Sequence, residues 1–310
     1  MTPLKKQRLI SPFLSLSPLL FYLTLSSVAL TVIMILLLVP KFAQGGTFDP
    51  MTLIEDLTTN PAVMLTDQAC MLLGAIIGCF LIRKRNRTSF KKVLSFQNFD
   101  ITVPIMLLIF SWSMGEVCDH FGGLVLSNFM EVEPNRTLPE GWVGFVVGVI
   151  GAPIAEELMF RYCGLEFPRG AYSAWIICLA NAIYFASMHL YNVQGFLNVF
   201  IGGFTMAYVY CKTRNLWYTL IEHALHNLLC LLPIFGNVYY EKNGFVLGQW
   251  WWVADNGVLL AVSLAYYFLY FRKKYNTDYF KVNTETGLPD PEFEAKAPVK
   301  PAAPAQYSVQ

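Results

Sequence analysis

Apolar stretches separated by short polar segments follow one another along most of this chain. Most are about 17 to 25 residues long, the length at which an α-helix crosses a hydrocarbon core of roughly 30 Å. Backbone polar groups find no partners in lipid, so such stretches must be helical. The pattern predicts an all-α, polytopic membrane bundle of about eight transmembrane helices. They are expected at Pro18–Val39, Val63–Ile82, Ile101–Cys118, Trp142–Phe160, Tyr172–His189, Phe196–Cys211, Leu216–Ile234 and Trp250–Phe271.

The first apolar stretch follows three basic residues near the N-terminus, as in a signal peptide. Its apolar run is too long for one, and no small-residue cleavage site follows cleanly, so we expect a true transmembrane helix. After the last stretch the sequence becomes polar and rich in Pro and Ala, which is typical of a disordered segment. The predicted division is an N-terminal segment 1–17, a helical domain 18–271 and a tail 272–310.

Composition and charge agree with a multi-pass membrane protein. Hydrophobic residues make up 55% of the chain and charged residues 14%, which is more apolar than a soluble core requires. Basic residues gather in 83–92 and 272–274, so the positive-inside rule predicts that both termini are cytoplasmic, and we expect a bacterial cell membrane. The net charge of +1 gives no indication of nucleic-acid binding, and we expect no such partner.

Two neighbouring glutamates lie within an otherwise apolar stretch, GAPIAEELMFRY. Ionisable groups inside a membrane cost roughly 2.5 to 3.5 kcal/mol each on insertion scales, which indicates a function or a paired partner. Glu157 and Arg161 are four apart on a helix, so we expect them to pair. Glu156 then points about 100° away, toward a different partner. The alternative is that both glutamates belong to one purely structural ion-pair network.

Histidines and an amide follow in two later apolar stretches. His189 ends YFASMHLY, one turn after Phe185, while His223 and Asn227 share a helix face in LIEHALHNLL. His226 lies about 60° from His223 around the helix axis and is expected to face the same site or support it from behind.

Glu156, His189, His223 and Asn227 together offer a carboxylate, two imidazoles and an amide. This set can activate water and stabilise an oxyanion. Two histidines and a carboxylate, here Glu156, His189 and His223, can equally hold Zn²⁺ with an open position for water. The helical H-E-x-x-H zinc motif is absent, and the residues leave both chemistries open.

Three motifs in this order resemble the family of CAAX-processing endopeptidases and bacteriocin-processing enzymes, the CPBP or Abi family of intramembrane proteases. E-E-x-x-x-R occurs at Glu156–Arg161, F-x-x-x-H at Phe185–His189 and H-x-x-x-N at His223–Asn227. The similarity covers roughly residues 148–232, within a protease-like core at about 142–234.

The resemblance implies that Glu156 and His189 activate the attacking water, while His223 and Asn227 stabilise the oxyanion. Glu157, Arg161, Phe185 and His226 would support these residues. Family members have been described as glutamate-dependent proteases and as metalloproteases, so the resemblance leaves Zn²⁺ open. Gly148, Gly151 and Pro153 are expected to open an internal cavity lined by the motif residues, through close helix approach or a kink.

The leading functional hypothesis is an endopeptidase that cuts a membrane-associated or prenylated protein, or a peptide precursor, within or near the bilayer. The alternative is a bacteriocin self-immunity or binding protein that uses the same fold without turnover. A transporter with ionisable residues at the midplane would be expected to show two related halves, and no internal repeat is apparent in the sequence.

Overall fold

The computed structural model describes residues 2–43, 60–86, 90–126, 141–189, 193–232 and 250–276. In these ranges the regular elements are all helices, as the apolar pattern predicts. The longer helices are α1 (Pro3–Ala43), α3 (Pro61–Asn86), α5 (Thr102–Leu126), α9 (Ala174–Ser187), α10 (Val193–Thr213), α11 (Leu216–Leu231) and α13 (Trp250–Tyr266). Short helix α4 spans Phe90–Val93, and α14 spans Arg272–Lys274.

The eighth long helical segment, residues 141–166, alternates between α-helical and π-helical turns. It consists of α6 (Gly141–Gly144), a π-helical segment Phe145–Gly151, α7 (Ala152–Glu156), a second π-helical segment Glu157–Cys163 and α8 (Gly164–Glu166). A third π-helical segment, Tyr267–Phe271, joins α13 to α14. Wide turns of this kind occur frequently at functional sites. Here one ends five residues before Glu156 and the next begins at Glu157.

Each predicted apolar stretch lies on one of these helices as far as the structure describes it, which confirms the polytopic helical bundle. Four segments among the described residues are long and apolar enough to cross a membrane: Leu4–Pro40, Pro61–Lys84, Gly141–Glu166 and Ala254–Lys274. Two shorter apolar helices, Thr102–Cys118 and Ala174–Ser187, accompany them.

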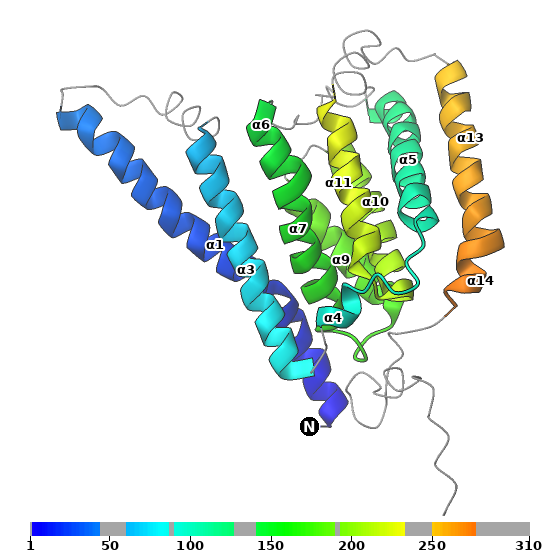
Figure 1. Ribbon diagram of the computed structural model, residues 1–310, viewed down its shortest axis with the longest axis horizontal. Helices are drawn as coiled ribbons and strands as arrows, with labels where there is room; N and C mark the ends of the chain where they lie inside the picture. Colours follow the sequence, from blue (N-terminus) through cyan, green and yellow to red (C-terminus); the bar gives the residue numbers. More distant parts are fainter. Residues whose placement is uncertain are drawn as a thin grey trace, which may run out of the picture.

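Helices α1 and α3 form a pair at one side of the molecule, while α5 and α13 lie at the other side (Figure 1). Glycines allow the close approach of α1 to α3. A Cβ atom at Gly78 would lie 2.5 Å from Pro18 Cγ and 2.8 Å from Cys163 Sγ. This is the small-residue packing that membrane helices use. Between the two pairs lie α7, α9, α10 and α11, and the three motifs lie on or next to α7, α9 and α11.

The first helix begins at Pro3, well before the apolar stretch that starts at Pro18. Two side chains in the additional turns bind the connection between α8 and α9. Gln7 Nε2 donates to the carbonyl of Phe167 at 2.9 Å, and Arg8 Nε donates to that of Ala171 at 2.8 Å. These contacts help to hold the polar N-terminal turns in helical form.

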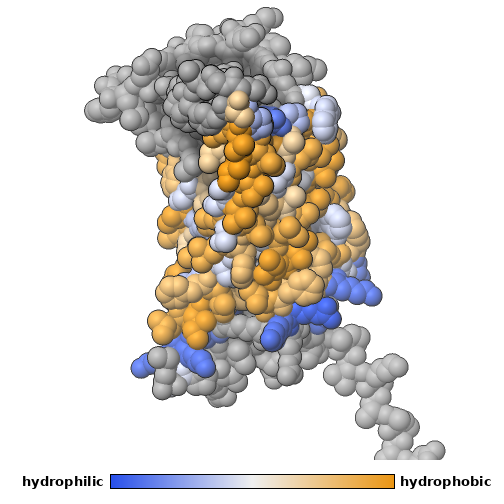
Figure 2. All heavy atoms as spheres, turned by 90° about the vertical axis from the view of Figure 1, so that its left-hand side faces the viewer, coloured by the Kyte–Doolittle hydropathy of each residue, from blue (hydrophilic) through white to orange (hydrophobic). Residues whose placement is uncertain are grey.

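Exposed basic side chains gather at one end of the bundle, where α1 begins and α3 and α14 end (Figure 1). In the space-filling view, apolar side chains cover the flank above hydrophilic ones at that end (Figure 2). The basic residues there include Lys5, Lys6, Arg83, Lys84, Lys91, Lys92, Arg272 and Lys273. The cytoplasmic location of the termini stays a prediction, and most of the predicted tail, 277–310, lies outside the described residues.

Candidate functional site

Glu157 and Arg161 form the buried ion pair that their spacing predicts. Arg161 Nε lies 3.3 Å from Glu157 Oε2, and both side chains are fully buried. The guanidinium also packs over the ring of Phe185, with 4.1 Å from its central carbon to the ring centroid, and Arg161 Nη2 lies 3.4 Å from Met206 Sδ. The Arg161 guanidinium is not in contact with solvent, so removing Glu157 would leave a buried cation unpaired.

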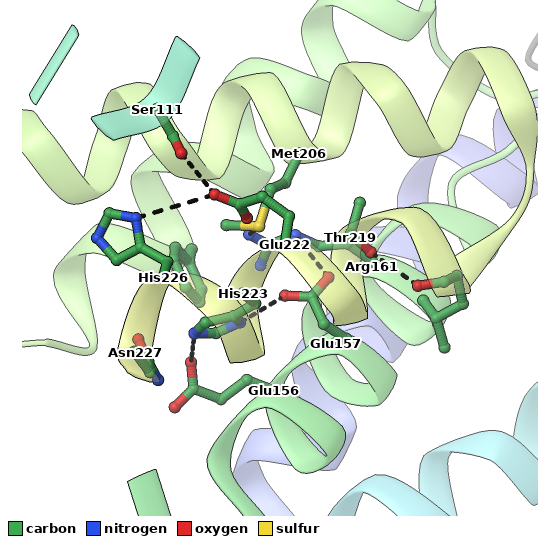
Figure 3. Close-up of polar contacts among 12 residues, drawn as sticks. Ser111, Glu156, Glu157, Arg161, Met206, Thr219, Glu222, His223, His226 and Asn227 are labelled. Carbon is green, nitrogen blue, oxygen red and sulfur yellow. Dashed lines mark hydrogen bonds and ion pairs between the residues drawn. The ribbon is translucent and has the colours of Figure 1, made fainter. Parts of the chain in front are cut away.

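Glu157 also holds the first histidine of α11. Its Oε1 lies 3.0 Å from His223 Nδ1, and because a carboxylate only accepts, the imidazole donates from Nδ1 (Figure 3). The other ring nitrogen, Nε2, therefore faces away from Glu157. The carboxylate fixes the ring orientation, as buried carboxylates do beside functional histidines.

His189 is oriented in the same way, by its own helix. Its Nδ1 lies 2.9 Å from the carbonyl oxygen of Phe185, which accepts only, so Nδ1 carries the proton. The Phe185 ring packs against both histidines, with centroid distances of 4.6 Å to His189 and 6.0 Å to His223. Phe185 thus contacts three motif residues, because Arg161 lies over the same ring. Its place in F-x-x-x-H has a packing explanation.

Both oriented imidazoles present Nε2 to Glu156. Glu156 Oε2 lies 3.8 Å from His189 Nε2 and 3.8 Å from His223 Nε2. This oxygen is buried, and it has no hydrogen-bond partner among the described residues. The Glu156 side chain keeps 13% of its surface exposed and that of His189 keeps 22%, whereas Glu157 keeps none. The two neighbouring glutamates therefore have different environments, as their positions on the helix predict.

Asn227 binds a backbone carbonyl of the first π-helical segment. Its Nδ2 donates to the carbonyl oxygen of Gly148 at 2.8 Å. In this segment the Ala152 N–H bonds to the carbonyl of Val147, five residues earlier. The next residue, Pro153, has no N–H and cannot supply the matching bond to Gly148. The proline thus leaves the Gly148 carbonyl for Asn227, and the second N–H of the amide is available to another acceptor.

The face of α11 next to His223 turns toward α5. Glu222 is 2% exposed, and Ser111 Oγ donates to its Oε1 at 2.5 Å (Figure 3). His226 Nδ1 lies 3.9 Å from the same Oε1, and its ring contacts Trp112 at a centroid distance of 5.6 Å. His226 therefore lies with Glu222 beside the site, while Glu156 faces the other two imidazoles.

The three predicted Zn²⁺ ligands, Glu156, His189 and His223, lie near one another, but their side chains are not arranged as a metal site. Among the described residues, no set of three or more His, Cys, Asp and Glu side chains is placed to hold a metal ion. His189 and His223 do carry the orienting bonds at Nδ1 that metal-bound histidines usually have. Binding of Zn²⁺ by these residues stays a prediction.

Several polar partners were not predicted from the sequence. The Gly148 carbonyl, Ser111 and the buried Glu222 contact become apparent only when distant helices meet. Asn181 is a further example, because its Nδ2 donates to the carbonyl of Phe160 inside the second π-helical segment at 2.8 Å. One signal was present in the sequence: a proline five residues after Gly148 marks a carbonyl without its π-helical donor.

Comparison with known proteins gives one family. Residues 138–229 match the family described as type II CAAX prenyl endopeptidase, Rce1-like. This segment contains all three motifs and the helices α7, α9 and α11 that carry them. No curated protein and no solved structure matches the chain. Over this segment the chain is similar to the CAAX-processing endopeptidases, the family that its three motifs resemble.

Proposed function

We propose that this protein is an intramembrane endopeptidase that hydrolyses a peptide bond in a membrane-associated or prenylated protein or peptide precursor. The observation that carries the proposal is the environment of Glu156. Its buried Oε2 lacks a hydrogen-bond partner among the described residues and faces the Nε2 atoms of two imidazoles at 3.8 Å each. Both rings are held at Nδ1, so their reactive nitrogens have a fixed direction.

In the proposed reaction, a water molecule lies between Glu156 and His189. Its oxygen attacks the carbonyl carbon of the peptide while Glu156 accepts its proton, as a positioned general base does. The peptide C–N bond then breaks, and the proton on Glu156 passes to the leaving amine nitrogen. Water is thus divided between a new carboxylic acid, which receives its OH, and a new amine, which receives its other hydrogen, with Glu156 returned to its starting state.

His223 and Asn227 are proposed to stabilise the oxyanion formed by the attack. The second N–H of Asn227 is available because Gly148 accepts the first. His223 can donate from Nε2 in its protonated form, which the carboxylate of Glu157 stabilises at 3.0 Å. Preorganised donors of this kind are worth roughly 10² to 10³ in rate when measured one at a time.

The proposed reaction uses Glu156 as the base without a metal ion, and removal of metal ions tests it against the metal-dependent alternative. Activity of the purified protein should then persist, within about twofold, after dialysis against 1,10-phenanthroline and EDTA. A loss restored by Zn²⁺ alone would instead establish the metal-dependent alternative, in which Glu156, His189 and His223 supply the ligands.

The experiment uses the purified full chain in detergent and an internally quenched peptide ending in a farnesylated Cys-aliphatic-aliphatic-X sequence. We expect cleavage by the wild type and loss of at least about 100-fold in kcat in Glu156→Gln. Asp67→Asn is the matched control, because Asp67 lies in α3 and its oxygens are bound by Tyr22 and Ser26. Equal cleavage by wild type and Glu156→Gln would overturn the mechanism. Absence of cleavage in every variant would count against the substrate class and favour the non-catalytic alternative.

A further inference from the structure

Glu222 is a buried carboxylate next to the proposed site that the mechanism above does not use. It is 2% exposed and lies on α11, directly before His223. Ser111 of α5 donates a hydrogen bond to it at 2.5 Å, while the second acceptor of that hydroxyl, the Leu108 carbonyl, is farther away at 3.2 Å. Bonds from a hydroxyl to a carboxylate are short and strong. A buried contact of this strength connects two helices that are distant in sequence.

Helix α11 is thereby held from two sides (Figure 3). On one side, His223 binds Glu157 at 3.0 Å and Asn227 binds the Gly148 carbonyl at 2.8 Å. On the other side, about 100° around the helix from His223, Glu222 binds Ser111. A rotation of α11 that lengthens the Ser111 bond must also carry His223 and Asn227 around the helix axis.

We infer that the hydrogen bond from Ser111 to Glu222 sets the rotation of α11, and that both residues position His223 and Asn227 against Glu156. The consequence for catalysis rests on the proposed function, whereas the positional claim does not. A side-chain group about 5 to 6 Å from a helix axis moves by roughly 1 Å when the helix turns by about 10°. A displacement of that size can cost about 100-fold in rate.

The chain supplies a matched control for removal of this contact. Ser113 lies on the same helix, is fully buried, and donates within α5 to the Ile109 carbonyl at 2.6 Å. Ser111→Ala and Ser113→Ala therefore remove the same group at similar burial, but only the first breaks a link to α11. Glu222→Gln retains an oxygen that can accept from Ser111, whereas Glu222→Leu does not.

The test is NMR of the imidazole rings in the full chain labelled with ¹⁵N-histidine, combined with kinetics on the farnesylated peptide. The chain has 4 histidines, so the ring signals of His223 can be assigned by their loss in His223→Gln. We expect Ser111→Ala and Glu222→Leu to shift or broaden these signals and to lower kcat by about tenfold or more with little change in KM. Ser113→Ala should leave both unchanged, and Glu222→Gln should recover most of the rate.

The outcomes separate the inference from the proposed function. Unchanged His223 signals in Ser111→Ala, or equal changes in Ser113→Ala, would overturn the inference even if the wild type cleaves the peptide. Shifted signals in Ser111→Ala and Glu222→Leu alone would support it even if the wild type cleaves nothing, in which case the proposed function fails. A fall in thermal stability without a shift of the His223 signals would mean that Glu222 only stabilises the fold.

Discussion

One helical segment, residues 141–166, carries three glutamates, and two of them, Glu166 and Glu156, have opposite environments. Glu166 is fully paired: Arg214 binds it at 2.8 and 3.0 Å, Arg169 at 2.9 Å and the Tyr210 hydroxyl at 3.1 Å. Glu156 instead has a buried oxygen with no hydrogen-bond partner among the described residues and two imidazoles 3.8 Å away. The difference teaches that burial of an acid does not by itself indicate reactivity. The number and strength of its partners separate a structural carboxylate from one available to a substrate.

Glu166→Ala should give the largest effect, and it should act on stability. The change leaves two buried guanidinium groups without their shared carboxylate, which costs roughly 3 to 5 kcal/mol. We expect a large fall in accumulation and in melting temperature in detergent. If Glu166→Ala melts like the wild type, the distinction between the two carboxylates is wrong.

Asn227→Ala should act on the rate. It removes one proposed oxyanion donor, so we expect kcat on the farnesylated peptide to fall by about 100-fold. The Gly148 carbonyl also loses its partner, which should lower stability by about 1 kcal/mol. Steady-state kinetics and thermal melting check both parts. An unchanged kcat would remove Asn227 from the proposed site.

Pro153→Ala tests why the Gly148 carbonyl is available. The substitution restores an N–H at the position that lacks one, and this N–H would compete with Asn227 for Gly148. We expect a fall in kcat of several-fold to about tenfold without a loss of stability. Ile154→Ala, which changes a partly exposed neighbour and leaves this donor pattern intact, is the control. Equal rates for Pro153→Ala and wild type would show that the proline has no such role.

Replacing Asp100, in the connection before α5, should have the smallest effect on stability, and that effect should depend on pH. Partial burial alone would raise the pKa of Asp100, but hydrogen bonds from Lys274, Thr102 and Tyr270 outweigh it and lower the pKa from 3.8 to about 2. Stability from this contact should be present above about pH 4 and lost as the pH falls toward 2. Asp100→Asn should therefore melt slightly below the wild type at pH 7, because its free energy of unfolding falls by about 1 kcal/mol or less. Melting curves that differ equally at pH 2 and pH 7 would contradict this assignment.

Local sequence patterns were sufficient to predict the helices and one contact between side chains. Apolar length predicts membrane helices because lipid demands internal backbone bonding. The bond between Glu157 and Arg161 follows from their i, i+4 spacing, and the structure confirms it at 3.3 Å. The different directions of Glu156 and Glu157 likewise follow from helix geometry. Catalytic roles for these residues stay proposals.

Contacts between distant helices could not be predicted in this way. Ser111 and Glu222 are 111 positions apart, and Gly148 and Asn227 are 79 apart, so no local spacing relates them. Glu166 lies at the end of an apolar helix, and its partner Arg214 is 48 positions later. Single-sequence periodicity reports which face of a helix is apolar, but it does not report which helix packs there. The second π-helical segment has a partner of this kind too, because Asn181 Nδ2 donates to its Phe160 carbonyl.

The most direct test of the account compares peptide fragments in membrane and secreted fractions of cells that express wild type or Glu156→Gln at matched levels. The account predicts fragments that appear with the wild type, disappear with Glu156→Gln and persist with the control Asp67→Asn. The sequence at their new ends would define the cleaved bond. If the same fragments also form in cells that express Glu156→Gln, this carboxylate does not have the central role proposed for it.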